Sequence, residues 1–318
     1  MQTTYKVLRI DPVHPLLDEI LKRNHIDVTE NLTGSYDEIV KIIPRFDGLV
    51  LRSRIPVDAR LISKGKRLKF IARVGSGLEG IDRAYAESKG IRVINAAEGN
   101  ANAVGEMTLG LLLALLRNIN KAGSEIKSGQ WLRNANRGYE LQGKTVSIIG
   151  YGNTGKAFAR KLAGFDVNVL FYDIKPGLQD RYAREADIRE IFEQTDVLSL
   201  HVPLTELTRY LVNETYINRF KKPFWLINTS RGEVVKTDDL VKALESGKIR
   251  GTALDVIEYE NKAFGDMLLK DHLPPAFQKL RQMPQVILTP HIAGITYESA
   301  VKLSEITAEK ILKILKTE

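Results

Sequence analysis

An arginine, a carboxylate and a histidine in the last third of the chain have the types and order of an acid–base site. Arg231 lies in Asn228-Thr229-Ser230-Arg231-Gly232, Glu260 follows Asp255, and His291 lies in Thr289-Pro290-His291-Ile292-Ala293-Gly294. An arginine can clamp a carboxylate with two parallel hydrogen bonds, and an imidazole exchanges protons near neutral pH. A nearby carboxylate would orient the imidazole and favour its protonated form. The reversible oxidation of a 2-hydroxy acid requires these groups, besides a hydride acceptor.

Each of these residues also has an ordinary structural interpretation. Arg231 could form a salt bridge, His291 could cap a strand end, and Glu260 could be a solvated loop acid. Glu258 lies close by, so the choice of acid is open, although the spacing from Asp255 favours Glu260. The combination after successive strands is what points to catalysis. No His, Cys or Asp cluster has metal-ligand spacing, so no metal is expected.

A glycine pattern further upstream indicates where the hydride acceptor would bind. The apolar run 145–149 leads into Gly150, Gly152 and Gly155, and a helical pattern follows at 156–162. The first glycine allows a tight turn, the second lets the backbone approach a pyrophosphate, and the third permits close helix–strand packing. Strand, glycine pattern and helix in this order predict a dinucleotide site.

The next predicted strand ends in an acid that suits the adenosine ribose. Asp173 follows the run 169–172, where a carboxylate would receive the ribose hydroxyls and repel a 2′-phosphate. The sequence therefore favours NAD over NADP, and Lys175 leaves that preference open. Asp173 could alternatively cap a turn.

Composition limits the classes of protein to consider. The chain has 318 residues, 43% apolar and 27% charged, with no cysteine and a net charge of +8. These values fit a globular protein of two domains in a reducing, cytoplasmic setting. The start lacks a signal peptide, and the longest apolar stretch, 109–116, is too short to cross a membrane. The positive charge suits a small anionic substrate; no nucleic-acid motif accompanies the basic cluster 64–67, so specific nucleic-acid binding is not expected.

Alternating β-branched runs and helical patterns predict a parallel α/β architecture. Strands are expected at 6–10, 48–53, 68–73 and 92–95, with a helix at 15–23 and one long helix at 103–127. A second series of strands is expected at 145–149, 168–172, 197–201, 224–228, 251–256 and 286–288, followed by an amphipathic helix at 298–315.

These elements predict two doubly wound domains, with a Rossmann NAD-binding domain inserted in a flavodoxin-like substrate domain. Residues 1–100 would begin the substrate-binding domain, 101–285 would form the NAD-binding domain, and 286–318 would return to the first. The stretch 264–280, which contains Pro274-Pro275, is interpreted as an insertion near the rim of the site, with His272 at the surface.

The motifs resemble the D-isomer-specific 2-hydroxyacid dehydrogenase family over nearly the whole chain. They are the glycine pattern, His201-x-Pro203 with Thr208, the run 228–232, Leu254-Asp255-Val256 and Thr289-Pro290-His291. The resemblance implies an NAD-dependent enzyme whose catalytic triad is Arg231, Glu260 and His291. It also implies a homodimer that pairs through the long helix and neighbouring segments of the cofactor domain. The family usually has proline after the glutamate, where this chain has Asn261.

The same resemblance assigns the cofactor contacts. Asp255 would meet the nicotinamide end, Thr229 would lie beside the cofactor, and Ser76 would face the nicotinamide from the other domain. The full set implied is Ser76, Gly150, Gly152, Asn153, Thr154, Gly155, Asp173, His201, Val202, Pro203, Thr208, Thr229, Asp255 and Gly294.

Two further arginines suggest a second anionic group on the substrate. Arg52 and Ser53 follow one predicted strand of the first domain, and Arg73 and Gly75 follow the next. Such a pair would cradle a phosphate while Arg231 holds the carboxylate. This pattern resembles the D-3-phosphoglycerate dehydrogenases, which serve serine biosynthesis, so 3-phosphoglycerate is the expected substrate. Alternatively, the arginines belong to a generally basic surface.

Three rival interpretations stay open at this stage. A hydroxypyruvate, glyoxylate or D-lactate type of reductase would use the same triad without a phosphate site. An NAD-sensing corepressor or scaffold would keep the fold without the reaction, and a nucleic-acid binder is suggested by net charge alone. Because the last helical pattern runs to the end of the chain, we expect no C-terminal serine-binding domain and no inhibition by serine.

Overall fold

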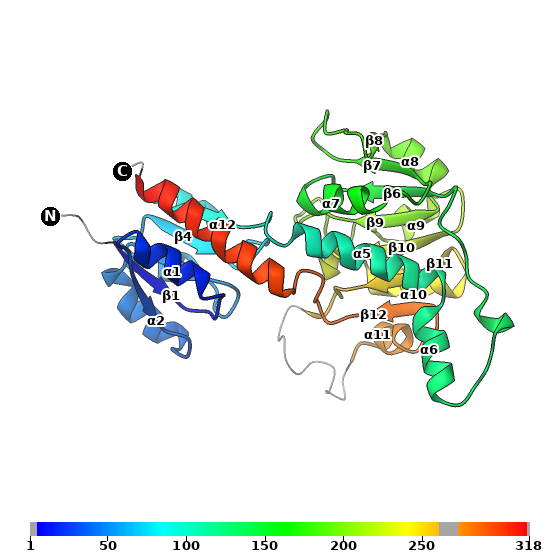
Figure 1. The fold of residues 1–318 in the computed structure, drawn as a ribbon, viewed down its shortest axis with the longest axis horizontal. Coiled ribbons are helices and arrows are strands. Elements are labelled where there is room, and N and C mark those ends of the chain that lie inside the picture. The colour runs from blue at the N-terminus through cyan, green and yellow to red at the C-terminus, as the bar shows by residue number, and fades with distance from the viewer. Residues whose placement is uncertain (1–4, 261–272, 317–318) are drawn as a thin grey trace. The chain divides into compact units, whose positions relative to one another are not determined.

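The computed structural model describes residues 5–260 and 273–316, which form two compact units (Figure 1). The first unit combines residues 1–101 with 295–318, and the second contains residues 102–294. The predicted return at residue 286 falls before β12 (Val286–Leu288), whereas the structure keeps that strand in the second unit. The reason is that β12 pairs with its neighbour β11 from Thr252 to Leu254.

The first unit is built on a five-stranded parallel sheet in the order β2-β1-β3-β4-β5. This is the order of flavodoxin-like folds. The strands are β1 (Lys6–Arg9), β2 (Asp27–Glu30), β3 (Gly48–Leu51), β4 (Phe70–Arg73) and β5 (Arg92–Asn95). The polar strand β2 was not predicted, because the exposed residues Asp27 and Glu30 give it no apolar run.

Helices cover both faces of this sheet. One apolar cluster packs the sheet against α2 (Tyr36–Ile42), α3 (Ala59–Lys64) and α4 (Arg83–Ser88), and the other packs it against α1 (Leu16–Arg23) and α12 (Tyr297–Lys316). The first three begin at side-chain caps, and Ser35 with Glu38 forms a complete capping box on α2. A short 3₁₀ turn, η1 (Ile43–Arg45), follows α2.

The second unit is built on a seven-stranded parallel sheet in the order β12-β11-β10-β9-β6-β7-β8. Its strands are β6 (Thr145–Ile149), β7 (Asn168–Tyr172), β8 (Arg184–Glu185), β9 (Val197–Leu200), β10 (Phe224–Asn228), β11 (Ile249–Leu254) and β12. From β6 the next strands are added toward one edge of the sheet, and from β9 they are added toward the other edge. This change of strand order between β6 and β9 is typical of a dinucleotide-binding fold. The predicted Rossmann and flavodoxin-like classes are therefore confirmed, with the two-residue β8 as an unpredicted edge.

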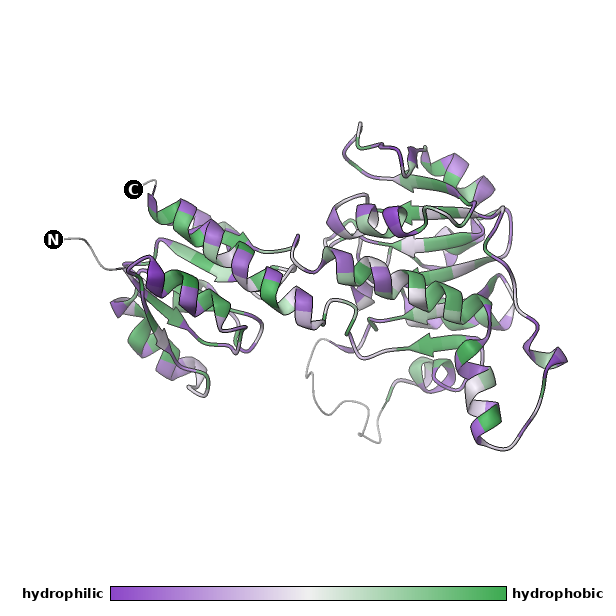
Figure 2. Cartoon of the chain, viewed as in Figure 1, coloured by the Kyte–Doolittle hydropathy of each residue, from purple (hydrophilic) through white to green (hydrophobic). Residues whose placement is uncertain are grey.

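Helices again lie on both faces. One core packs the sheet against α5 (Ala101–Leu116) and α7 (Asn153–Lys161). The other packs it against α8 (Ile188–Gln194), α9 (Glu214–Asn218), α10 (Thr237–Glu245) and α11 (Pro275–Leu280). Two 3₁₀ turns, η2 (Asn134–Asn136) and η3 (Gly232–Val234), complete the unit. In Figure 2 the strands of both sheets are mainly hydrophobic, whereas the helices carry a hydrophilic outer side.

The single helix predicted over 103–127 is wrong, because the chain forms α5 and then α6 (Ile119–Lys127). Asn118 between them has a left-handed backbone with φ 54°, which asparagine tolerates better than most residues. The Leu116 carbonyl, which would have continued the helix, accepts the N–H of Tyr139 instead. The returning chain therefore ends α5 and redirects α6.

The stretch interpreted as an insertion is only partly described. Residues 261–272, with His272, lie outside the described residues. The remainder forms α11, whose Ala276, Phe277 and Leu280 are buried in the core beside α10. This end of the stretch is therefore part of the hydrophobic core.

Candidate active site

The three loops that carry the predicted acid–base residues emerge side by side. Asn228 at the end of β10 pairs with Leu254 of β11, and Leu254 pairs with Leu288 of β12. The carboxyl ends of parallel strands meet at one edge of a sheet, where ligands bind in such folds. The loops 229–232, 255–260 and 289–294 therefore share this edge.

A buried amide shapes the turn that presents Arg231. Asn228 has no exposed surface, and its Oδ1 accepts the backbone N–H of Ser230 at 3.0 Å and the Ser230 hydroxyl at 2.7 Å. Its Nδ2 donates to the Arg231 carbonyl at 2.9 Å. Gly232 is required next, because a Cβ there would lie 1.9 Å from the Ile257 carbonyl oxygen. Arg231 is half-buried, and its Nη1 donates to the Ser230 carbonyl.

A second buried group holds the loop that carries His291. Asp255 is 1% exposed and accepts three hydrogen bonds, from the Thr289 hydroxyl (2.6 Å), the Ile292 N–H (2.9 Å) and the Ala293 N–H (2.7 Å). The N–H of His291 donates to the Asp255 carbonyl at 2.8 Å. These bonds hold His291 at φ 54°, a left-handed conformation that is uncommon for residues other than glycine.

The structure places Glu260, and not Glu258, beside the histidine. His291 Nδ1 lies 3.4 Å from Glu260 Oε1, and both side chains are mostly shielded from solvent. Glu258 instead accepts the N–H of Thr237 at 2.9 Å, where it caps the start of α10. Its hydrogen bond to Tyr210 raises the pKa of that phenol. The ambiguity left by the sequence is thus resolved in favour of Glu260 as the neighbour of His291.

The three glycines after β6 meet different surroundings. Gly150 has φ +92°, and a Cβ there would lie 2.6 Å from the His201 carbonyl oxygen. At Gly155 a Cβ would lie 2.2 Å from the Gly150 oxygen, so this glycine allows close packing of helix on strand. At Gly152 a Cβ would meet nothing within 4 Å. That opening, at the N-terminus of α7 with Asn153 and Thr154 in its first turn, fits a pyrophosphate.

Asp173 lies against the same turn. Its carboxylate accepts the N–H of Tyr151 at 2.7 Å and that of Lys175 at 2.9 Å. Tyr151 is fully buried and stacks on Phe171 with ring centroids 3.9 Å apart. The half-buried carboxylate therefore lies beside the glycine turn, and its hydrogen bond from the Lys175 N–H is the turn cap that the sequence left as the alternative.

His201 lies beneath the glycine turn rather than at the surface. Its Nδ1 is 3.2 Å from the Thr154 hydroxyl and its Nε2 is 2.9 Å from that of Ser199, and the ring stacks on Phe158. Burial lowers the pKa of His201 to about 3, because the charged imidazolium would lose its hydration. The ring is therefore a neutral support for Thr154.

The residues after His201 form a closed loop. The Thr208 hydroxyl donates to the Pro203 carbonyl at 2.6 Å and accepts the N–H of Thr205 at 2.8 Å. Val202 packs against the core below.

At the end of β10, the hydroxyl of the buried Thr229 lies 3.0 Å from that of Thr108 on α5. Gly294 is half-buried and ends the second unit.

In the first unit, the predicted phosphate ligands have unequal surroundings. Arg52 and Ser53 are exposed, and within residues 5–260 and 273–316 neither side chain makes a hydrogen bond or ion pair. Arg73 donates from Nε to the Arg52 carbonyl at 2.8 Å and from Nη1 to the Gly77 carbonyl. Gly75 lies directly against the Arg73 guanidinium. Arg73 therefore ties two loops together, which its position at the end of β4 could not reveal.

Ser76, expected at the nicotinamide, is half-buried in the first unit. Its hydroxyl bonds the Asn100 side chain at 2.8 Å, and its carbonyl accepts from Asn95. Sequence reasoning missed the two buried supports Thr108 and Ser199. Their only signal was a hydroxyl within an apolar helix or strand.

In the described part of the chain, no helix is long and apolar enough to span a membrane. This part also holds no group of three or more His, Asp or Glu side chains that could bind a metal ion.

Comparisons with known proteins agree with this geometry. The family model for the NAD binding domain of D-isomer specific 2-hydroxyacid dehydrogenases matches residues 109–293. The chain is 37% identical over 315 residues to a hydroxypyruvate reductase of Thermotoga maritima, covering 98% of each protein. It is 36% identical to a D-3-phosphoglycerate dehydrogenase of Methanocaldococcus jannaschii, covering 98% of this chain and 58% of the relative.

A solved structure gives the same result for the fold. The D-lactate dehydrogenase of Aquifex aeolicus, complexed with NAD and lactic acid, superimposes with a TM-score of 0.84 at 28% identity. The match covers 98% of this chain and 96% of the other. The chain therefore belongs to the D-isomer specific 2-hydroxyacid dehydrogenase family, and it is an NAD-dependent oxidoreductase of D-2-hydroxy acids.

Proposed function

We propose that Arg231 binds the substrate carboxylate and that His291 exchanges the proton of the C2 hydroxyl. With Nδ1 3.4 Å from Glu260, the ring would use Nε2 for this exchange, and the carboxylate would stabilise the imidazolium that results. NAD supplies the hydride acceptor. In the oxidation, the C2 hydrogen leaves as hydride while the hydroxyl proton passes to His291, and reduction reverses both transfers. The observation that carries this proposal is the distance of 3.4 Å between His291 Nδ1 and Glu260 Oε1. Asp255 fixes the loop that carries His291.

The chain contains a matched pair of variants that tests these roles. Glu260→Gln should lower kcat at least about tenfold, because the neutral amide no longer stabilises the imidazolium. Glu258→Gln changes the same side chain two positions away, where it caps α10, and should leave kcat within about twofold. Equal effects of the two variants would reject Glu260 as the partner of His291.

The residues around Gly152 would hold the cofactor. Thr154 and the first turn of α7 would meet the pyrophosphate, and Asp173 would accept the ribose hydroxyls. Asp255 keeps its carboxylate engaged with the loop 289–293. We therefore assign it chiefly to positioning His291, with a contact to the nicotinamide as a secondary role.

For the substrate, D-3-phosphoglycerate fits the first unit best, which would place the enzyme in serine biosynthesis. Arg52 and Ser53 offer a guanidinium and a hydroxyl to a phosphate group, whereas Arg73 would hold the Arg52 loop. The relative from Methanocaldococcus jannaschii, a D-3-phosphoglycerate dehydrogenase, supports this choice.

A second candidate is the reduction of hydroxypyruvate. The relative from Thermotoga maritima, which matches this chain over 98% of both lengths, is a hydroxypyruvate reductase. In the reductive direction the two candidate keto acids, 3-phosphohydroxypyruvate and hydroxypyruvate, differ only in the phosphate, so the kcat/KM values for these two acids separate the candidates directly. A preference of about a hundredfold for the phosphorylated acid, lost in Arg52→Ala, would establish the phosphate site. Equal values would assign the enzyme to hydroxypyruvate.

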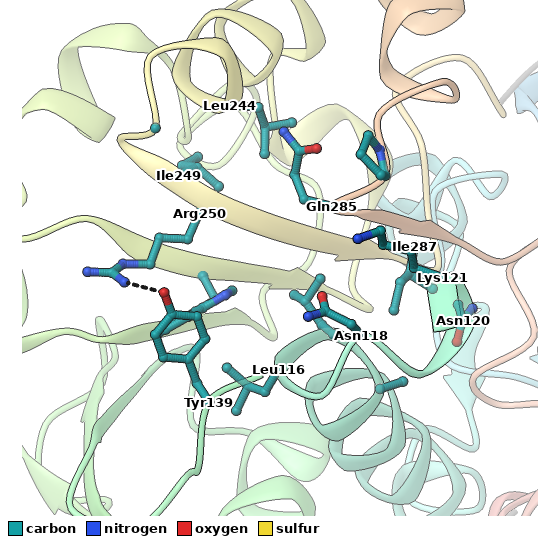
Figure 3. A pocket seen from close by; sticks show the side chains of 15 residues that line it. Leu116, Asn118, Asn120, Lys121, Tyr139, Leu244, Ile249, Arg250, Gln285 and Ile287 are labelled. Atoms are coloured by element: carbon teal, nitrogen blue, oxygen red, sulfur yellow. Dashed lines mark hydrogen bonds between the residues drawn. The ribbon is translucent and has the colours of Figure 1, made fainter. Parts of the chain in front are cut away.

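We also propose that the chain forms a homodimer through the segment 119–139 and the pocket beside it. No residue of α6 is buried, and Trp131 on the following loop is 77% exposed. The pocket, about 290 Å³ in volume, is lined by Leu116, Tyr139 and Arg250 among others (Figure 3). A second copy would cover these apolar surfaces. Sedimentation of Trp131→Ala should then show a larger monomer fraction than the parent, whereas a monomeric parent would refute the proposal.

A further inference from the structure

A buried carboxylate that belongs to no recognised motif lies at the carboxyl edge of the first sheet. Asp11 follows β1 and is 4% exposed. Its Oδ2 accepts the backbone N–H groups of three successive residues: Arg52 at 2.5 Å, Ser53 at 3.0 Å and Arg54 at 3.3 Å. One oxygen atom therefore fixes the whole turn that follows β3.

The side chain of Arg54 fastens the same turn from the other direction. Its Nε donates to the Ile10 carbonyl at 2.8 Å and lies 3.6 Å from Asp11 Oδ1. Its terminal nitrogens donate to the carbonyls of Asn31, at 3.1 Å, and Gly34. Together, Asp11 and Arg54 join the loops that follow β1, β2 and β3.

This arrangement determines which groups can meet an incoming anion. Successive backbone N–H groups that converge on one point form an anion-binding nest. Here the chain fills the nest with its own carboxylate, so a substrate anion cannot use these amides. The exposed side chains of Arg52 and Ser53 are the groups that the same turn still presents.

We infer that Asp11 is a positioning residue for substrate recognition, which sets the direction of Arg52 and Ser53 by fixing their backbone. This inference rests on the proposed role of Arg52 in binding the substrate phosphate. In this proposed role, Asp11 itself does not contact the substrate. Its negative charge alone would weaken anion binding, so the two possible effects of removing it have opposite signs.

The test compares Asp11→Ala with Asp47→Ala. Asp47 is also buried, at 5% exposure, and also accepts a backbone N–H, from Lys6 at 2.8 Å, while bonding Arg67. Asp47 directly precedes β3, whereas the Arg52 turn follows β3, so the two lie at opposite ends of this strand. Both variants lose a buried carboxylate of the first unit, but only one of them releases the Arg52 turn.

We expect Asp11→Ala to raise the KM for 3-phosphohydroxypyruvate about tenfold while kcat changes less than about threefold. Asp47→Ala should leave KM unchanged. Asp11→Asn retains one acceptor oxygen for the nest, should give an intermediate KM, and replaces the alanine variant if that variant does not fold. In an Arg52→Ala background, removal of Asp11 should raise KM much less than it does in the parent, because only Ser53 is then left to be positioned.

Three results would overturn the inference. They are a KM in Asp11→Ala equal to that in Asp47→Ala, a lower KM as charge removal alone predicts, and independent, multiplicative effects of Asp11→Ala and Arg52→Ala. If Arg52→Ala alone leaves the parent KM unchanged, the proposed phosphate site fails and the inference fails with it. A changed KM in Arg52→Ala with none in Asp11→Ala rejects the inference alone.

Discussion

Acid should destabilise the second unit through one histidine, His201. The ring is 8% exposed, is held between the hydroxyls of Ser199 and Thr154, and has a pKa lowered by burial to about 3. In the unfolded chain the same imidazole titrates near pH 6.5. Between these two values the unfolded state binds a proton that the folded state does not, so stability falls as the pH falls.

The size of the effect follows from the two pKa values. The contribution of His201 is fully present above about pH 6.5, and each pH unit below that removes about 1.4 kcal/mol until the folded pKa is reached. Acidification from pH 7 to pH 5 should therefore cost about 2 kcal/mol at this residue. That figure does not depend on the exact folded value, provided that it lies well below 5.

The measurement is urea unfolding at pH 7 and pH 5, followed by tryptophan fluorescence. Both tryptophans of the chain, Trp131 and Trp225, lie in the second unit, so the signal reports the unit that contains His201. In His201→Asn, the loss of stability between pH 7 and pH 5 should be smaller than in the parent by about 2 kcal/mol. Other groups titrate in both proteins and cancel.

His25→Asn, in the first unit, is the control for loss of a histidine elsewhere in the chain. His25 is exposed and has φ 60°, a conformation that asparagine accepts readily. It should show the same pH dependence as the parent. If His201→Asn also keeps the parental difference between pH 7 and pH 5, His201 is not held neutral by burial and the reasoning is refuted.

Three other perturbations have definite expected outcomes. Gly150→Ala forces a side chain into φ +92° and against the His201 carbonyl, so thermal unfolding should show a loss of about 2 kcal/mol or more, with weaker NADH binding by titration. Asp255→Asn weakens the bonds that hold the loop of His291, so kcat should fall about a hundredfold in steady-state assays, whereas a tenfold rise in KM(NADH) alone would contradict a positioning role. Asp173→Ala should raise KM(NADH) about tenfold and lower the preference for NADH over NADPH, and an unchanged preference would exclude Asp173 from the ribose site.

The sequence was a good guide to the fold where hydrophobic periodicity and side-chain burial coincide. The apolar strands β3, β6 and β10 are buried on both faces, and each was predicted from its β-branched or aromatic run. The polar strand β2 lies at a sheet edge, so its pattern resembles a loop. The break at Asn118 depends on a contact with Tyr139, which no local pattern contains.

The candidate site divides in the same way. Residue type and order predict Arg231 and His291 as catalytic residues, because few side chains can perform those steps, and these roles stay a proposal. The choice between Glu258 and Glu260 required the structure, since the two acids are locally alike and differ only in the partners that the fold brings to them. Arg73 was expected to bind phosphate, but the backbone carbonyls of Arg52 and Gly77 occupy its guanidinium in part. Hydrogen-bond partners distant in sequence decide such roles.

Three groups assigned to the reaction share one kind of support. A buried polar side chain at a strand end holds the backbone that presents each of them: Asn228 holds Arg231, Asp255 holds His291, and Asp11 holds Arg52. Each support has most of its hydrogen-bonding capacity satisfied within the protein, which offsets the cost of its burial. The two arginine side chains are long and flexible, and the imidazole turns about two bonds, so the direction of each group depends on the backbone beneath it. Substitutions at the supports should therefore alter kinetics without removing any group that touches the substrate, and they would be overlooked in a search restricted to exposed residues.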